Sequence, residues 1–99
     1  MALSKWSINI VQQGGSVVFT PDLPGAQPGQ PLGVLVNDLI TWYNMTNNPQ
    51  VLTGTDPNLN YQIPAGQVSD PIYQAPATAG TITYTLQSGE QGSIVVTTS

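Results

Sequence analysis

The sequence contains no cysteine and no histidine, and Lys5 is its only basic residue. Without cysteine there are no disulfide bonds and no thiolate metal ligands, and without histidine the commonest metal ligand and the usual base of a serine nucleophile are missing. Only 6% of the residues are charged, against about 25% in an average domain. The net charge is −4. The acidic residues are Asp22, Asp38, Asp56, Asp70 and Glu90.

This charge balance limits the partners of the chain. Binding to nucleic acid needs several Lys or Arg residues to displace counterions, and binding to anionic membranes needs a polybasic patch. We therefore expect no nucleic-acid and no membrane partner. No run approaches the ~18 apolar residues of a membrane span, and residues 1–11 lack the apolar core of a signal peptide. A polar, Lys-poor surface favours an extracellular or periplasmic location of a processed chain, with a cytoplasmic protein as the alternative.

Apolar and polar residues alternate along most of the chain. Trp6, Ile8 and Ile10 alternate with Ser7 and Asn9, and the same period of two recurs over residues 81–86. Proline- and glycine-rich segments, above all residues 21–31, separate these runs. We expect short strands at residues 6–10, 17–19, 32–36, 39–43, 51–52, 61–63, 68–73, 81–86 and 93–97, with Pro71 marking an edge strand.

Residues 1–99 are expected to form one domain, since this length supports a single hydrophobic core. Many short strands with frequent turns predict an all-β fold, a Greek-key antiparallel β-sandwich. Periodicity alone does not separate the possible sandwiches, so immunoglobulin-like and fibronectin-like folds remain alternatives. The expected core residues are Ile8, Ile40, Trp42, Tyr84, Ile94 and Val96.

Two segments narrow the choice of fold. Residues 38–44 read DLITWYN and are followed by Pro49 and Gln50, while residues 80–86 read GTITYTL and are followed by GSIVV at 92–96. This order resembles the cupredoxin pattern, in which GD-x-V-T-W-x-N precedes a liganding His. In that pattern G-x-Y-x-Y-x-C leads through a second His and a Met to G-x-I-x-V. Residues 64–67, PAGQ, are similar to the P-G-x segment of the same family.

The resemblance implies a cupredoxin-like fold without the family's copper ligands. By this resemblance the first His position falls on Gln50 and the Cys position on Leu86, while the second His and the Met fall within residues 87–91. A carboxamide and a hydrocarbon do not replace an imidazole and a thiolate. We therefore expect no metal and no cofactor. Gln50 and Gln91 are expected to be ordinary polar residues at a sheet end, with ligand contact at the vacated metal position as the alternative.

The acids offer weaker hypotheses. Asp22, Asp38, Asp56 and Asp70 lie in turn-like segments, where aspartate commonly bonds the local backbone. A calcium site is the alternative, although no twelve-residue EF-hand spacing is present. An acid–base pair of Asp38 and Glu90 would require the fold to bring the two together. The triplet 44–46, Asn-Met-Thr, fits the N-glycosylation pattern, which also arises by chance.

The aromatic residues divide into two groups. Trp6, Phe19, Trp42 and Tyr84 fall on inward faces and are expected in the core. Tyr43, Tyr61 and Tyr73 are expected on outward faces or in loops, where exposed tyrosines favour binding surfaces. The simpler interpretation is that these three tyrosines pack over loops.

Two classes of function follow. The first is a metal-free, non-enzymatic binding or structural module that contacts a protein, a glycan or copies of itself. The candidate residues of this surface are Tyr43, Tyr61, Tyr73, Gln50 and Gln91. The second is a small-ligand carrier or enzyme that uses Gln50, Gln87 and Gln91 at the vacated end of the sandwich. An engineered or ancestral-type scaffold without its metal is a minor third interpretation.

Overall fold

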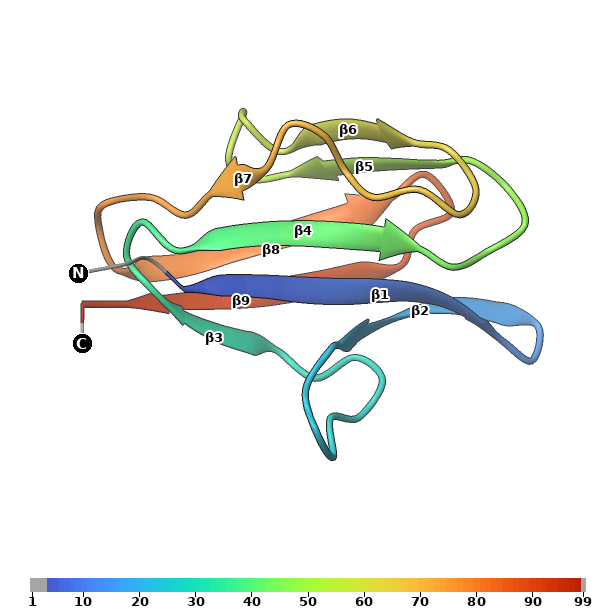
Figure 1. Ribbon diagram of the computed structural model, residues 1–99, viewed down its shortest axis with the longest axis horizontal. Coiled ribbons are helices and arrows are strands. Elements are labelled where there is room, and N and C mark those ends of the chain that lie inside the picture. The colour runs from blue at the N-terminus through green and yellow to red at the C-terminus, as the bar shows by residue number, and fades with distance from the viewer. Residues whose placement is uncertain (1–3, 99) are drawn as a thin grey trace.

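The structure is a computed structural model that describes residues 4–98, and within that range two β-sheets pack face to face (Figure 1). One sheet has four strands in the order β2-β1-β4-β7, and the other has five in the order β3-β9-β8-β5-β6. The strands of the first sheet are β1 (Lys5–Gln13), β2 (Ser16–Pro21), β4 (Leu39–Asn44) and β7 (Tyr73–Gln74). Those of the second are β3 (Leu32–Leu35), β5 (Gln50–Gly54), β6 (Asn60–Ile63), β8 (Gly80–Leu86) and β9 (Gln91–Thr97).

The residues that alternate in the sequence point to opposite faces of each sheet. Along β4, Ile40, Trp42 and Asn44 point into the sandwich and are fully buried, while Tyr43 points outward. All six core residues expected from the sequence are buried: Ile8, Ile40, Trp42, Tyr84, Ile94 and Val96. Of the two remaining aromatics expected in the core, Phe19 is buried, whereas Trp6 is only partly buried against the core.

The Greek-key sandwich expected from the sequence is confirmed, but its sheets are mixed rather than wholly antiparallel. β1 and β4 pair in parallel, as do β3 and β9. The reason is the path of the chain, which leaves the β1–β2 hairpin, crosses to the other sheet at β3, and returns so that β4 runs beside β1 in the same direction (Figure 1). None of residues 4–98 lies in a helix long and apolar enough to cross a membrane.

The edge strand expected over residues 68–73 is shorter than the sequence suggested. Only Tyr73 and Gln74 form β7, while Val68 makes an isolated bridge to Tyr43 of β4. The intervening Pro71 lacks an N–H group, so the hydrogen-bonded ladder is interrupted there.

The centre of the sandwich is an aromatic cluster around Trp42. The rings of Tyr61, Tyr73 and Tyr84 lie 6.1, 5.9 and 5.2 Å from the Trp42 ring, and Phe19 meets Tyr84 edge-to-face at 4.6 Å. These rings come from both sheets, so the cluster ties the two layers together.

Candidate functional site

The loop between β4 and β5 meets the β8–β9 hairpin at one end of the sandwich, on the right of Figure 1. The Gln87 side chain joins them: its Oε1 accepts a hydrogen bond from Val51 N at 2.8 Å, and its Nε2 donates to Gln50 Oε1 at 3.2 Å. The structure therefore brings Gln50 and Gln87 together, as the resemblance implied. Gln91 lies opposite Thr85 with an exposed side chain, and among residues 4–98 no hydrogen bond joins it to Gln50 or Gln87.

Asn44 is the centre of a buried polar network behind Gln50. Its Nδ2 donates to the Asn48 carbonyl oxygen at 2.8 Å and to the Ile63 carbonyl oxygen at 2.9 Å. Its Oδ1 accepts from the backbone N of Thr46 at 2.9 Å and from the Thr46 hydroxyl at 2.6 Å. A carboxamide has two donor hydrogens and two acceptor positions, so every hydrogen-bonding group of Asn44 is satisfied.

Thr46 links this network to Gln50. The Thr46 hydroxyl accepts from Gln50 Nε2 at 3.0 Å. Its single hydrogen has two acceptors in reach, Asn44 Oδ1 at 2.6 Å and the Asn48 carbonyl oxygen at 2.9 Å. Asn44 Oδ1 is the closer acceptor, and the Asn48 oxygen already accepts from Asn44. The result is a continuous path from Asn44 through Thr46 and Gln50 to Gln87.

These residues do not fit a blue copper ion. Such a site needs a thiolate and two imidazoles around the metal. By the sequence resemblance Gln50 falls at the first His position, and both its amide oxygen and its amide nitrogen are used by neighbours. By the same resemblance Leu86 falls at the Cys position, and it is a buried hydrocarbon. The network occupies this end with neutral amides and a hydroxyl, so it offers no metal-binding set and no proton donor or acceptor near neutral pH.

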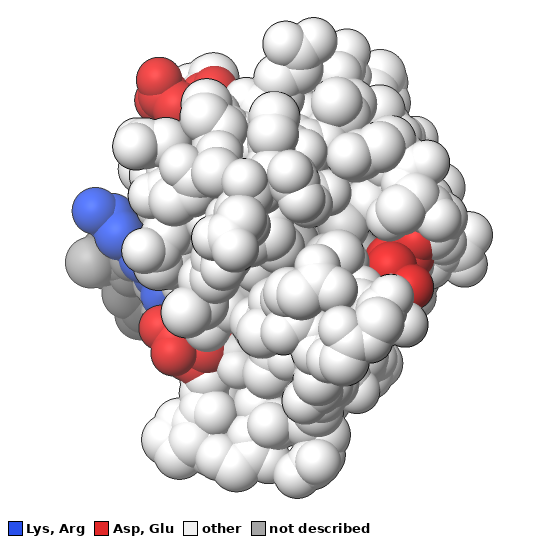
Figure 2. Space-filling view, turned by 90° about the vertical axis from the view of Figure 1, so that its right-hand side faces the viewer, with Lys and Arg blue, Asp and Glu red and all other residues white. Residues whose placement is uncertain are grey.

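The surface over this network carries little charge. Figure 2 faces this end of the molecule and shows uncharged side chains across its middle, with acidic and basic side chains toward its margins. An open hollow of about 380 Å³ lies beside Gln50, and its walls are mainly apolar. They include Pro49, Val51, Ile63 and Pro64.

The acids do not converge on a site. Asp38 lies in the turn between β3 and β4, and Glu90 lies in the β8–β9 hairpin, at opposite ends of the sandwich (Figure 1). The hypothesis of an acid–base pair of Asp38 and Glu90 is therefore wrong. Within residues 4–98 no group of three or more His, Cys, Asp and Glu side chains gathers, so nothing favours the calcium alternative.

Asp38 is instead a structural anchor for the N-terminal strand. Its Oδ2 accepts hydrogen bonds from the Trp6 indole nitrogen at 2.9 Å and from Leu35 N at 3.0 Å, and its Oδ1 accepts from Ser4 N at 3.3 Å. Burial raises the pKa of the Asp38 carboxyl, but these three donors outweigh burial and hold the pKa below its ordinary value. The turn interpretation is thus confirmed for Asp38, and for Asp56, whose Oδ1 accepts from Asn58 N at 2.9 Å.

Two of the three candidate surface tyrosines are buried. Tyr61 lies opposite Leu52 and is 7% exposed, and Tyr73 lies opposite Ile40 and is 2% exposed. Residues opposite each other across a strand pair point to the same face, so both tyrosines share the inward face of their buried partners. The expectation that they lie outward is wrong, and only Tyr43, 38% exposed, is an exposed tyrosine of this set.

Tyr43 belongs to an exposed apolar group on the outer face of the four-stranded sheet. Val68 bridges to Tyr43, and Met45 continues β4 beside β1 through a hydrogen bond from Met45 N to the Ile10 carbonyl oxygen at 2.9 Å. Val11 and Val18 pair on the neighbouring strands and are half-buried. We call these five residues the apolar face: Val11, Val18, Tyr43, Met45 and Val68.

The buried network was not predicted from the sequence, because the strand expected over residues 39–43 ends before Asn44. The one available signal was the Asn-Met-Thr triplet. In the structure Asn44 is 0% exposed and both hydrogens of its Nδ2 are donated, so a glycan on this nitrogen is incompatible with the fold. The alternation of residues 40, 42 and 44 would have placed Asn44 inward and indicated a structural amide.

No protein-family model matches the sequence, and no curated protein matches it. Among solved structures, the chain is similar to an amicyanin variant in the Cu(I) state, with 18% identity and a TM-score of 0.65 over 98% of this chain and 86% of that one. A second reduced amicyanin variant gives 17% identity and a TM-score of 0.66 over the same shares.

A multicopper oxidase variant from the hyperthermophile Aquifex aeolicus is also similar, with 13% identity and a TM-score of 0.63 over 95% of this chain. The chain spans 26% of the length of that oxidase. At these identities the likeness establishes the arrangement of the strands and not an activity. The chain has the cupredoxin fold, its sequence contains no cysteine and no histidine, and within residues 4–98 no group of His, Cys, Asp and Glu side chains gathers that could hold a metal.

Proposed function

We propose that the chain is a non-enzymatic structural module that associates with copies of itself through the apolar face of its four-stranded sheet. The observation that carries this proposal is the continuity of exposed apolar side chains around Tyr43: Met45 and Val68 are both 52% exposed and flank it. Clustered exposed apolar residues favour contact with another surface more than singly scattered ones do.

Electrostatics supports a second copy as the partner. The five residues of the apolar face are uncharged, and the whole chain carries a net charge of only −4. Copies therefore repel one another weakly, and weak repulsion permits self-association. The same neutrality gives no attraction to a strongly charged partner such as nucleic acid.

The size of the apolar face sets the expected strength. Strands spaced about 4.8 Å apart, with outward residues every ~6.7 Å along each strand, give these five side chains about 160 Å². Stable interfaces bury about 800 Å² on each partner. We therefore expect a weak, reversible association that depends on concentration.

Sedimentation velocity over a wide concentration range tests this proposal. The wild type should show a concentration-dependent increase in mass. The variant Tyr43→Ser/Met45→Gln/Val68→Thr should remain monomeric. A control variant, Val51→Thr/Val95→Thr, removes two comparably exposed valines from the five-stranded sheet and should associate like the wild type. A wild type that stays monomeric up to about millimolar concentration, or a control variant that loses association equally, would overturn the proposal.

A small-ligand carrier is the second candidate, supported by the hollow beside Gln50. Its apolar walls favour a small apolar molecule rather than a charged one. The polar atoms of Gln50 already have hydrogen-bond partners within the network, so they contribute little to orienting a ligand. Saturable binding of an apolar fluorescent probe, abolished by Val51→Asp and retained by Val95→Asp, would favour this candidate.

A further inference from the structure

A second open hollow, of about 380 Å³, lies where the edges of the two sheets approach each other. Tyr61 of β6 and Gln74 of β7 line it together with Asn37 and Asn58, while Pro71 and Ile72 supply apolar wall. Its volume is at the lower end of the range of ligand sites, which fits one side chain or a small molecule.

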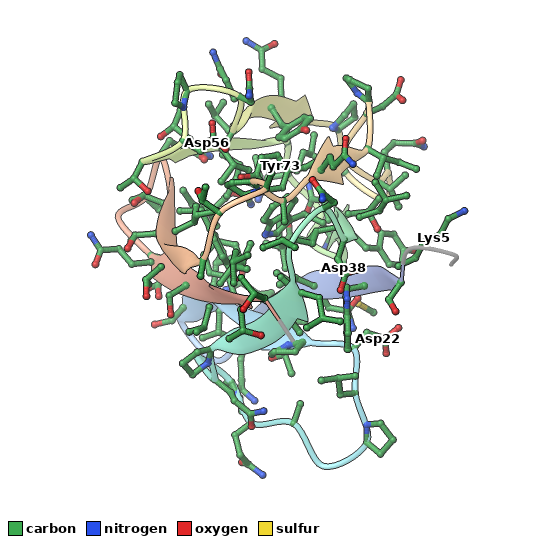
Figure 3. The ribbon with its side chains drawn as sticks, turned by 90° about the vertical axis from the view of Figure 1, so that its left-hand side faces the viewer. Lys5, Asp22, Asp38, Asp56 and Tyr73 are labelled. Atoms are coloured by element: carbon green, nitrogen blue, oxygen red, sulfur yellow. The ribbon has the colours of Figure 1, made fainter. Side chains whose placement is uncertain are left out.

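One rim of this hollow is held by a contact between the sheets. The Tyr73 hydroxyl of β7 donates to Asp56 Oδ2 at 2.6 Å, and Asp56 Oδ1 accepts from Asn58 N at 2.9 Å. Figure 3 shows Tyr73 and Asp56 side by side. This pair fixes a carboxylate next to Asn58, and therefore places a negative charge beside the hollow.

The hydroxyl of Tyr61 is the group left for a ligand. Tyr61 is only 7% exposed, yet its hydroxyl makes no hydrogen bond to any of residues 4–98 and is not among their fully enclosed polar atoms. The hydroxyl therefore reaches the space around it, where water or a ligand can bond it. Since Tyr61 lines the hollow, its remaining exposure opens into that space.

The potential at this hydroxyl is negative. Burial raises the pKa of Tyr61, and the charges of Asp56 and Asp70 raise it further. Asp56 accepts a hydrogen bond from Tyr73, which lines the same hollow as Tyr61. Asp70 is exposed and directly precedes Pro71 at the wall of the hollow. With a net charge of −4, the remainder of the chain adds to this potential.

We propose that this hollow binds an organic cation, a guanidinium or alkylammonium group carried on an aliphatic stem. The Tyr61 hydroxyl and the Asn58 amide oxygen accept its hydrogens, Asp56 and Asp70 supply the opposite charge, and Ile72 contacts the stem. A metal ion is not favoured, because among residues 4–98 no three acidic side chains converge. A neutral polyol would bond the amides but gain nothing from the two carboxylates.

The test uses the full chain, labelled with ¹⁵N, and two probes that differ only in charge. n-Butylguanidinium should produce saturable shifts at Asn58, Tyr61, Ile72 and Gln74, with a dissociation constant on the order of 1–10 mM for so small a ligand. Its neutral isostere n-butylurea should bind at least about fivefold more weakly, and salt should weaken the cation alone. Equal binding of the two probes, tighter binding of glucose, or no saturable shifts would overturn the proposal.

Two variants locate the interaction. Asp70→Asn should weaken n-butylguanidinium binding by roughly threefold to fivefold while leaving n-butylurea binding unchanged. Tyr61→Phe should weaken it similarly and keeps the ring that packs on Trp42. Tyr43→Phe removes a hydroxyl outside the hollow and should have no effect. If Asp70→Asn and Tyr61→Phe, both shown to be folded by circular dichroism, bind like the wild type, the site is wrong.

A final comparison identifies the source of the cation. The blocked tripeptide Gly-Arg-Gly presents the same guanidinium on a protein backbone. If the tripeptide binds more tightly than n-butylguanidinium, the proposal is supported with a partner's side chain as the ligand. If n-butylguanidinium binds more tightly, the proposal is supported with a free small organic cation as the ligand. None of the five residues of the apolar face lines this hollow, so the outcome is separate from that of the self-association test.

Discussion

Tyr84 of β8 lies directly opposite Gly92 of β9, and its ring covers the glycine so closely that it takes the place of a side chain at position 92. A β-carbon built on Gly92 would overlap the ring and hydroxyl of Tyr84. The ring has little freedom to move away, because it packs edge-to-face against Phe19 and Trp42.

Gly92→Ala should therefore destabilise the fold by about 1–3 kcal/mol, the usual cost of overpacking a close-packed core. Gly80→Ala is the matched control, since Gly80 lies at the start of β8 with open space where its β-carbon would be. We expect the control to change the free energy of unfolding by less than about 0.5 kcal/mol. Urea denaturation measures both, and equal effects of the two substitutions would contradict the packing of Tyr84 on Gly92.

Asn44→Asp tests the buried network at the candidate site. An ionised aspartate donates no hydrogen bond, so it would leave the Asn48 and Ile63 carbonyl oxygens without their donor. Its negative charge would also repel these two oxygens. We expect a loss of about 3 kcal/mol or more in the free energy of unfolding at neutral pH. Asn47→Asp, at an exposed position of the same loop, should cost less than about 0.5 kcal/mol. A tolerated Asn44→Asp would show that the network does not hold this end together.

Much of the fold follows from the sequence because its long strands alternate clearly. Ile40 and Trp42 are placed inward by residues 39–43 alone, and the order of the segments 38–44 and 80–86 identifies the type of sandwich. The parallel pairing of β1 with β4 is not visible in this way, because it depends on which sheet each distant strand joins. Alternation tells which face a residue occupies and not which strand lies beside it.

The errors in the candidate site have a related origin. β6 and β7 are only four and two residues long, so their periodicity was too short to place Tyr61 and Tyr73. Asn44 was missed for another reason. In a sequence, a buried asparagine that bonds the backbone looks the same as an asparagine in an exposed loop. Only the hydrogen-bond partners in the structure distinguish the two.

The loss of folding stability at acidic pH should depend on Asp38. Its pKa in the folded protein lies below the ordinary value of 3.8, so the folded state binds this proton less readily than the unfolded state does. The stabilisation is therefore present above about pH 4 and is lost as the pH falls through the folded pKa. Asp38→Asn should lower the free energy of unfolding at pH 7, and the gap to the wild type should narrow as the pH falls below about 4. Asp22→Asn, an exposed acid, is the control, and a gap that is constant with pH would contradict the role of the Asp38 charge.

The loss of folding stability at alkaline pH should depend on the buried tyrosines. Burial and the hydrogen bond to Asp56 raise the pKa of Tyr73, and burial raises that of Tyr84, although the nearby Trp42 indole lowers it slightly. These groups keep their protons in the folded state above their ordinary value of 10.0, while the unfolded chain ionises there. The free energy of unfolding should therefore fall as the pH rises above about 10.

Tyr73→Phe separates the contribution of the hydrogen bond to Asp56. It should cost about 1–2 kcal/mol at pH 7, because a charge-assisted hydrogen bond is lost, and should make the decline above pH 10 less steep. Thermal unfolding followed by circular dichroism at several pH values measures both effects. A variant with the same alkaline slope as the wild type would show that Tyr73 ionises alike in the folded and unfolded states.

The most direct measurement of whether amides have replaced the metal is a titration of the ¹⁵N-labelled protein with Cu²⁺, followed by residue-resolved NMR and by visible absorption. Paramagnetic copper broadens the signals of residues close to it. Because Gln50 and Leu86 offer neither a thiolate nor an imidazole, the signals of residues 44–50 and 86–91 should keep their intensity at one equivalent, and no intense blue band should appear. Stoichiometric loss of those signals together with an intense blue band would contradict the claim that amides have replaced the metal site.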